Sequence, residues 1–291
     1  MEPVLRAKLE AALGRPVGQI SGRAIGGGCI NDAQVLDVDG DPFFFKSNSH
    51  ALPRQFEAEA KGLKALRDSG TTLVIPEPIA WSDTEGARFL VTEYLEPGRK
   101  IARFDELLGQ GLAELHACSH PYGFGFELDG YCGATPQPNG WFGGWREFYS
   151  RHRLGHQLML ANRKGFPGDS CVKLGRLIER LDEWIPQCLT SSLIHGDLWS
   201  GNVHVSPEGR PALIDPAAYF GHPEAELGMM ALFGGFSPTV WESYAEAHRL
   251  EPGWRNRLDL YTLYHVLNHF VLFGSWRYRA HAETILRQYV G

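Results

Sequence analysis

The sequence predicts an α+β protein with two lobes: a small β-rich N-lobe, residues 1–95, and a larger, mainly helical C-lobe, residues 96–291. Short apolar runs separated by turn residues fill most of the first third of the chain, which is typical of strands. Apolar residues at helical spacing dominate the remainder. Between the two, Glu96–Gly98 breaks the apolar pattern, and we expect the lobe boundary there.

Four apolar runs of the N-lobe are expected to form strands. VGQISGRAI, residues 17–25, leads through the glycine turn GGGCIND into AQVLDV, residues 33–38. Asp39–Gly40 predicts a tight turn into a hairpin partner, PFFFKS, residues 42–47, because Asp-Gly favours short hairpin loops. FLVTEYL, residues 89–95, returns to strand character at the end of the lobe.

A helix is expected between Pro53 and Gly70, since proline suits a first turn and glycine a helix end. Its apolar face is marked by Phe56, Ala60 and Leu63. Glu59 lies on this face, where a carboxylate needs a partner. Lys46, at the end of the run FFFK, is the natural partner. Alternatively, Lys46 is a strand-end lysine that extends its amine to water.

The C-lobe is expected to be helical over residues 104–117, 144–163 and 239–291, with a loop-rich segment over residues 120–144. A hairpin interrupts these helices at NVHVSPEGRPALID, residues 202–215, where two apolar runs flank a Pro-Glu-Gly turn.

Composition excludes several classes of protein. Of 291 residues, 43% are hydrophobic and 21% charged, which is typical of globular chains. A net charge of −6 makes nucleic acid and anionic membranes poor partners. Five cysteines, never spaced as C-x-x-C, argue against a disulfide framework or a structural zinc site. With an amphipathic N-terminus that lacks a signal peptide, they predict a cytoplasmic protein.

The motif HGDLWSGN, residues 195–202, is the strongest sign of chemistry. Because the hairpin that follows returns the chain to its start, Asn202 and Asp215 are expected to face each other. Amide and carboxylate oxygens beside phosphates suit Mg²⁺. Asp197 then remains to accept a proton from a hydroxyl. Either aspartate alone is better explained by a turn or cap, but the joint spacing favours catalysis.

The glycine turn before the second strand can bring backbone N–H groups close to a phosphate. An ordinary hairpin turn explains it equally well, and it lacks the Walker pattern. A cradle, a lysine, metal ligands and a base together match the parts needed for phosphoryl transfer.

HGDLWSGN and LIDPA resemble the catalytic and metal loops of the protein-kinase-like superfamily, in the form used by aminoglycoside and choline kinases. The tryptophan of HGDLW narrows the resemblance to the fructosamine 3-kinase (ketosamine kinase) family. The other matching stretches are GGGCIN, FEAEAKGLKAL, TPQPNGW with WREFYSRHRL, LFGGF and LYHVLNHFVLFG. They extend from residue 26 to residue 274. In PEAEL, Glu226 stands where the family usually has aspartate, so the interaction at that helix start needs testing.

The resemblance implies a two-lobed protein-kinase-like fold that uses ATP and Mg²⁺ to phosphorylate the 3-hydroxyl of a ketosamine, whether a small molecule or protein-bound, in a deglycation reaction. It implies a base, Asp197, and two metal ligands, Asn202 and Asp215. The nucleotide-binding residues that it implies are Gly26, Gly27, Gly28, Cys29, Ile30, Lys46, Glu59, Glu93 and Leu95, the last two facing adenine through the Glu93 carbonyl and the Leu95 N–H.

Further residues remain open to two interpretations. Trp199 is interpreted as a wall of the sugar site rather than as a core residue. His265 and His269 lie one helical turn apart without the glutamate of a zinc motif, so they are interpreted as core or pocket residues, with His269 assigned to the acceptor site. Cys29 is either redox-sensitive or simply packed under the glycine loop.

Two alternative functions remain: a kinase of the same fold that acts on an aminoglycoside or amino alcohol, and an inactive nucleotide-binding module. The second would lack the base, the lysine or a metal ligand, and all three are present in the sequence. The chain is expected to be a monomer or a weak homodimer.

Overall fold

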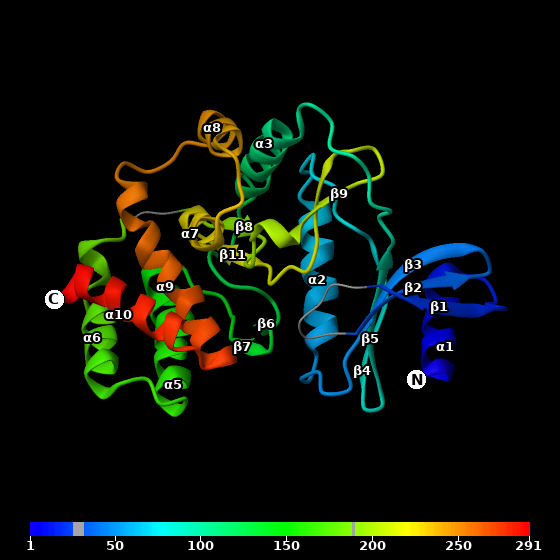
Figure 1. Cartoon of the computed structure of the whole chain (residues 1–291), viewed down its shortest axis with the longest axis horizontal. Helices are drawn as coiled ribbons and strands as arrows, with labels where there is room; N and C mark the ends of the chain where they lie inside the picture. Colours follow the sequence, from blue (N-terminus) through cyan, green and yellow to red (C-terminus); the bar gives the residue numbers. More distant parts are fainter. Residues whose placement is uncertain (26–31, 188–189) are drawn as a thin grey trace.

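Figure 1 shows the computed structural model, which describes residues 1–25, 32–187 and 190–291. Its N-terminal part is a five-stranded antiparallel sheet, ordered β1-β2-β3-β5-β4, with helices α1 and α2 against it. The bounds are α1 Glu2–Leu13, β1 Ile20–Ala24, β2 Asp32–Val38, β3 Asp41–Ser47, α2 Gln55–Asp68, β4 Pro78–Thr84 and β5 Ala87–Glu93. The strands and the helix expected from the sequence are present, and β4 is a strand that the sequence reading missed.

The side chains of β5 point alternately to the two faces of the sheet, and their contacts show that α1 and α2 lie on opposite faces. Phe89 and Val91 share an apolar cluster with Leu9 of α1, whereas Leu90, between them, belongs to the cluster around Leu63 of α2. Successive side chains of a strand point to opposite faces, so α1 and α2 cover different sides. Figure 1 shows α2 on the side that faces the helical part of the chain.

The register of β3 against β5 places Lys46 opposite Leu90. Directly opposed residues of antiparallel strands project to the same face. Lys46 therefore projects toward α2, which carries Glu59, and not toward α1.

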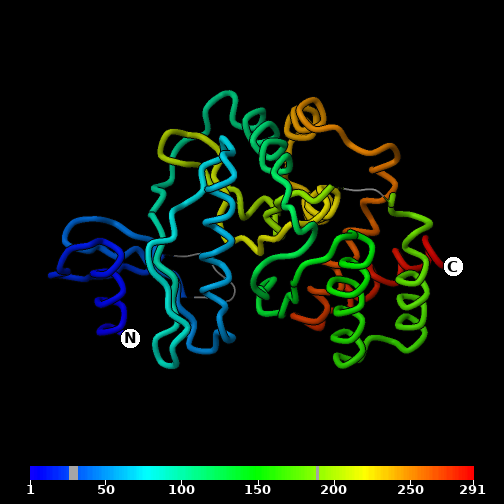
Figure 2. Tube along the Cα trace, turned by 180° about the vertical axis from the view of Figure 1, so that it is seen from behind, coloured from blue at the N-terminus to red at the C-terminus, as the bar shows by residue number. Residues whose placement is uncertain are grey.

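The C-terminal part is mainly helical and packs around a third apolar cluster, larger than the other two. Figure 2 shows the same arrangement from behind, with α5 and α6 on the near side of this part. The helices are α3 Phe104–His116, α4 Trp145–Phe148, α5 Gly155–Arg163, α6 Gly168–Glu179, α7 Pro223–Phe233, α8 Pro238–Ala247, α9 Trp254–Phe273 and α10 Trp276–Val290. Short 3-10 turns are formed by Leu181–Glu183 and Ser200–Asn202.

The continuous helix expected over residues 144–163 contains a π-helical turn, Tyr149–Leu154, between α4 and α5. Arg153 in this turn is fully buried, and its guanidinium donates to the Pro138 carbonyl at 2.8 Å and to Asn139 Oδ1 at 2.9 Å. A π-bulge re-aims the side chains of a helix. Here it accompanies an arginine that anchors the loop-rich segment preceding α4.

Four short strands hold the segments of interest. β8 Ser192–Ile194 pairs with β11 Tyr219–Gly221, and β9 Val203–Val205 pairs with β10 Pro211–Leu213, both antiparallel. The hairpin expected over residues 202–215 is thus confirmed. The two pairs bring the β8–β9 connection beside the β10–β11 connection. A further hairpin, β6 Gly130–Cys132 with β7 Thr135–Gln137, was not anticipated.

Within the described residues, no helix combines the length and the apolar character needed to cross a bilayer.

Candidate active site

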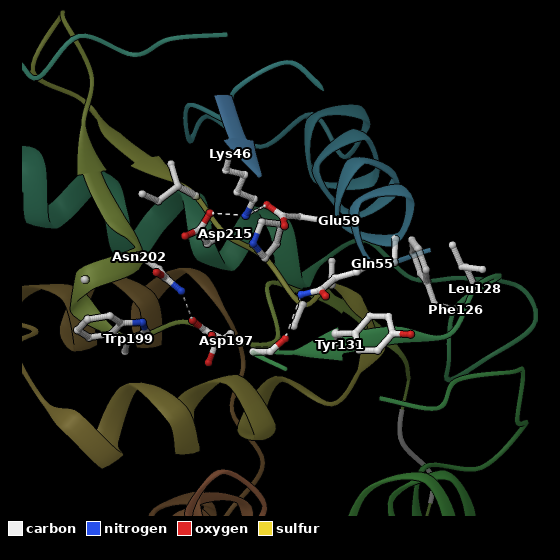
Figure 3. Close-up of a pocket in the computed structure, with 18 of the residues that line it drawn as sticks. Lys46, Gln55, Glu59, Phe126, Leu128, Tyr131, Asp197, Trp199, Asn202 and Asp215 are labelled. Carbon is white, nitrogen blue, oxygen red and sulfur yellow. Dashed lines mark hydrogen bonds and ion pairs between the residues drawn. The ribbon is translucent and has the colours of Figure 1, made fainter. Parts of the chain in front are cut away.

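Lys46 lies at the centre of the site and binds two carboxylates. Its Nζ forms an ion pair with Glu59 of α2 and another, at 2.9 Å, with Asp215 Oδ1 after β10. Burial opposes the charge on the lysine, but Asp215 and Glu59 together hold its pKa above the ordinary value. The expected Lys46–Glu59 pair is therefore present, and it is linked to Asp215, which lies far away in sequence (Figure 3).

The two carboxylates differ in their titration. Burial and the neighbouring Asp215 charge raise the pKa of Glu59 to about 7, against the opposing effect of Lys46. Lys46 instead lowers the pKa of Asp215, against the opposing effect of partial desolvation in the cleft. Asp215 adopts a left-handed backbone conformation, with φ 54°. Such a conformation is uncommon for residues other than glycine and is frequent at functional sites.

Backbone hydrogen bonds join the segment around Asp215 to the HGDLWSGN segment at both ends. Ile214 N donates to the Asn202 carbonyl at 3.1 Å, and Ala217 N donates to the His195 carbonyl at 2.9 Å. Gly196 has a φ of 83°, and a Cβ there would lie 2.1 Å from the Ala217 carbonyl oxygen. Only glycine permits so close an approach in this conformation.

Glu226 of α7 holds the backbone of the HGDLWSGN segment in place. It is 1% exposed, and its carboxylate accepts hydrogen bonds from His195 N at 2.5 Å and from Gly196 N at 3.1 Å. The glutamate at this position thus does contact the HGDLWSGN segment, which answers the question raised by its extra methylene. Helix α7, which carries Glu226, begins beside it with His222 as N-cap.

Asp197 is half-buried beside the cleft. Burial, with the charges of Glu226 and Asp215, raises its pKa to about 7. The Cys132 thiol donates a hydrogen bond to its carboxylate. Asn202 Nδ2 donates to the Asp197 carbonyl at 2.8 Å, which fixes the orientation of the amide (Figure 3).

The donor set around Asp215 fits a magnesium ion. With its nitrogen bound to Asp197, the Asn202 amide has its oxygen left to act as a ligand. Asp215 supplies a carboxylate, and Mg²⁺ prefers such oxygen donors. Two carboxylates, those of Glu59 and Asp215, contact the single ammonium group of Lys46, and Asp197 adds a third carboxylate to the same cleft, so the site can accommodate additional positive charge.

A cleft of about 500 Å³ runs between the sheet and the C-terminal part, a size typical of small-molecule sites. It is lined by Lys46, Glu59, Asp197, Asn202 and Asp215, and also by Gln55, Phe126, Leu128, Tyr131 and Trp199 (Figure 3).

Trp199 lies at the rim of this cleft and is not a core residue, because 41% of it is exposed. Its ring contacts Phe233 edge-on, with centroids 6.2 Å apart, and Phe233 in turn contacts His269 at 5.1 Å. His269 is thus next to the rim but does not line the described part of the cleft. Its Nδ1 is hydrogen-bonded to the His265 carbonyl at 2.7 Å.

The other predicted nucleotide residues are not tested by the described part of the cleft. Gly26, Gly27, Gly28, Cys29 and Ile30 lie outside the described residues. Glu93 ends β5 and Leu95 follows it, and neither lines the described part of the cleft. The Leu95 carbonyl accepts a hydrogen bond from His204 Nε2 at 3.0 Å.

Sequence reasoning missed the residues that the β6–β7 hairpin contributes. Cys132 ends β6 and contacts Asp197, while Gln137 ends β7 and donates to the Ala217 carbonyl at 3.0 Å. No spacing rule links these residues to the HGDLWSGN motif. The only signal in the sequence was the stretch TPQPNGW, residues 135–141, which contains Gln137 and begins three residues after Cys132.

The chain is similar to known proteins along its whole length. The family model for fructosamine kinase matches residues 1–291. The chain belongs to the fructosamine kinase family. A protein-ribulosamine 3-kinase of Oryza sativa subsp. indica is 44% identical over 273 residues, which cover 92% of this chain and 78% of that protein. The predicted family and the predicted class of enzyme, a phosphotransferase with an alcohol acceptor, are thereby confirmed.

Solved structures confirm the predicted fold of this fructosamine kinase family member. A protein of Thermobifida fusca assigned as a fructosamine-3-kinase superposes with a TM-score of 0.84, at 31% identity and 97% coverage of both chains. Aminoglycoside phosphotransferase APH(4)-Ia, in complex with ADP and hygromycin B, superposes with a TM-score of 0.65 at 18% identity, covering 99% of each chain. That second likeness concerns the fold alone.

Proposed function

We propose that this chain uses ATP and Mg²⁺ to phosphorylate the 3-hydroxyl of ketosamines, the adducts of a sugar with an amine. The observation that carries the proposal is the triple arrangement of Lys46, Glu59 and Asp215 in the cleft that also contains Asp197. A lysine held by a helix glutamate, metal-binding oxygens and a candidate base are the parts that phosphoryl transfer requires.

Asp197 is the proposed base. With a pKa raised to about 7, its carboxylate is both available and basic enough near neutral pH. It accepts the proton of the acceptor hydroxyl while the hydroxyl oxygen bonds to the γ-phosphorus and the bond to the leaving ADP oxygen breaks. Glu226 and Asn202 hold the backbone around Asp197 so that the carboxylate meets the hydroxyl in one orientation.

Asn202 and Asp215 are the proposed Mg²⁺ ligands, and the ion supplies charge neutralisation on the phosphates. Lys46 provides a second positive charge, since its pKa keeps the amine protonated throughout the physiological range. Because Lys46 already pairs with Asp215, phosphate binding exchanges one anionic partner for another. Glu59 remains as the partner that holds the ammonium group in place.

Each of the two parts of the chain binds one substrate, the nucleotide or the acceptor. We assign residues 1–95 to the nucleotide, with Gly26, Gly27, Gly28, Cys29 and Ile30 as its loop and Glu93 and Leu95 at the adenine. We assign residues 96–291 to catalysis and to the acceptor, whose sugar contacts Trp199 at the rim. His269 supports that rim through Phe233. Release of the amine from the phosphorylated adduct would make the overall outcome deglycation.

The test is ADP formation with purified protein across a panel of acceptors. The panel contains fructose-, ribose- and erythrulose-derived adducts of lysine, the parent sugars without an amine, and an aminoglycoside. We expect turnover with at least one ketosamine and none with the parent sugars. Preferential phosphorylation of the aminoglycoside or of a free sugar would contradict the proposal.

The Asp197→Asn variant tests the role of the base, because it keeps the size of the side chain and removes its basicity. We expect kcat to fall by about 10²–10⁴, the usual contribution of a positioned general base, with ATP affinity largely retained. Near-normal turnover would remove Asp197 from the mechanism.

A further inference from the structure

A second group of metal-binding side chains lies behind the proposed base. One ligand atom from each of Cys132, Asp197 and His265 lies within 4.8 Å of the others. The three residues come from β6, from the segment after β8 and from α9. Only the fold brings them together, because no two of them are close in the sequence.

The cluster contains a polar group without a partner. His265 is 3% exposed, and within the described residues its Nδ1 finds no hydrogen-bond partner. Burial lowers the pKa of this histidine to about 3, so the ring is neutral and able to act as a ligand. A buried, unpaired ring nitrogen is costly, and such groups in native proteins call for an explanation.

We propose that Cys132, Asp197 and His265 form a zinc-binding site. Zinc takes sulfur, nitrogen and carboxylate oxygen together, at about 2.0–2.3 Å in tetrahedral geometry. Such bond lengths separate the ligand atoms by about 3.4–3.8 Å, so atoms that lie within 4.8 Å of one another need to approach by about 1.4 Å at most. A water molecule or an acceptor hydroxyl fills the fourth position.

The ligand types distinguish this site from the proposed magnesium site nearby. Thiolate and imidazole favour zinc, whereas Asn202 and Asp215 offer only oxygen, which suits magnesium. Binding through sulfur releases the thiol proton of Cys132 to solvent. The ion reaches the site through the cleft. Asp197 forms part of the wall of the cleft, and so do Gly130 and Gly133, which lie on either side of Cys132 in the sequence.

Zinc at this site would occupy the carboxylate of Asp197. If Asp197 is the base, as in the proposed function on which this consequence rests, bound zinc prevents it from accepting the proton of the acceptor. Zinc is then an inhibitor that competes with the ketosamine and does not compete with ATP.

The experiment uses the full chain without nucleotide and titrates it with Co²⁺, a spectroscopic substitute for zinc. We expect one equivalent to bind, with a thiolate-to-cobalt absorption band in the near ultraviolet, and zinc to displace it. In Cys132→Ser the band should be lost and zinc affinity should fall at least about tenfold. His265→Gln should retain the sulfur band but also bind at least about tenfold more weakly.

Cys118→Ser is the matched control, because Cys118 is a half-buried thiol that is hydrogen-bonded to the Ser69 carbonyl. This variant should keep the band and the affinity of the parent chain. Thermal melts establish that each variant is folded. A chain that binds no cobalt, or a folded Cys132→Ser variant with unchanged zinc affinity, would overturn the site.

Activity assays separate the site from the proposed function. Zinc that raises the KM for the ketosamine but not for ATP, in the parent chain and not in Cys132→Ser, supports both. Zinc that binds through Cys132 without slowing turnover supports the metal site and contradicts the role of Asp197 as the base.

Discussion

Replacing Glu226 by glutamine should loosen the catalytic segment in a measurable way. The carboxylate accepts from His195 N at 2.5 Å and from Gly196 N at 3.1 Å, and the residue is almost fully buried. An amide has one oxygen, so one of the two backbone donors loses its acceptor and faces an NH₂ group. A hydrogen bond to a charged group contributes about 1.5–3 kcal/mol, and a buried donor left unpaired costs about 1–3 kcal/mol.

We therefore expect Glu226→Gln to lower the free energy of unfolding by about 3 kcal/mol. Unfolding entropy of about 2.1 cal/mol/K per residue gives about 0.6 kcal/mol/K for a chain of this length, so Tm should fall by about 5 °C. Because the two amides immediately precede Asp197, kcat should also fall by about 10- to 100-fold, as for a displacement of the base by about 1 Å.

The assay combines thermal unfolding with steady-state kinetics. Glu226→Asp, the residue usual in the family, keeps the charge but is a methylene shorter and should give an intermediate loss. Glu246→Gln, on the exposed surface of α8, is the control for the amide substitution and should change neither quantity. A Glu226→Gln variant with the Tm and kcat of the parent chain would refute the reasoning.

Three other outcomes are expected. Asp215→Ala should abolish turnover while the chain stays folded by circular dichroism, since it removes a proposed metal ligand and a partner of Lys46; retained turnover would exclude the role as a ligand. Trp199→Ala should raise the KM for the ketosamine far more than that for ATP, and equal effects with a lowered Tm would contradict a place at the acceptor rim. Burial and the Arg257 charge lower the pKa of His222 to about 3. As the pH falls, the unfolded chain therefore takes up a proton on His222 before the folded chain does. The free energy of unfolding then decreases below about pH 6.5. The free energy of unfolding, measured with denaturant, should fall between pH 8 and pH 5 by about 2 kcal/mol less in His222→Asn than in the parent chain. Asparagine keeps an acceptor at the N-cap. Equal decreases in the two proteins would contradict a neutral His222.

Local features of the site were predictable from the sequence. Asn202 and Asp215 belong to one hairpin, so a turn and two apolar runs suffice to bring them together. Glu59 was placed by helical periodicity, because a single face of α2 carries it with the apolar residues. In both cases the relevant distances are set within one supersecondary unit.

Long-range features were not predictable in this way. Cys132 meets Asp197 only because the β6–β7 hairpin packs against the segment after β8, and no periodicity relates the two. The π-helical turn at Arg153 depends on its buried hydrogen bonds to Pro138 and Asn139, which no pattern along the helix reports. Strand β4 begins at a proline and contains Asp83, both of which weaken a strand pattern.

The main-chain hydrogen bonds between the HGDLWSGN segment and the segment around Asp215 indicate where the substrate preference of this enzyme can be altered. Ile214 to Asn202 and Ala217 to His195 are contacts between main-chain atoms, so side-chain replacement elsewhere leaves their spacing intact. Phe126, Leu128 and Tyr131 line the cleft from a different segment, which leads into the β6–β7 hairpin, and we propose that they face the acceptor. Laboratory evolution toward new acceptors is therefore best confined to these three side chains, while Cys132, which contacts Asp197, and the main-chain hydrogen bonds are kept unchanged.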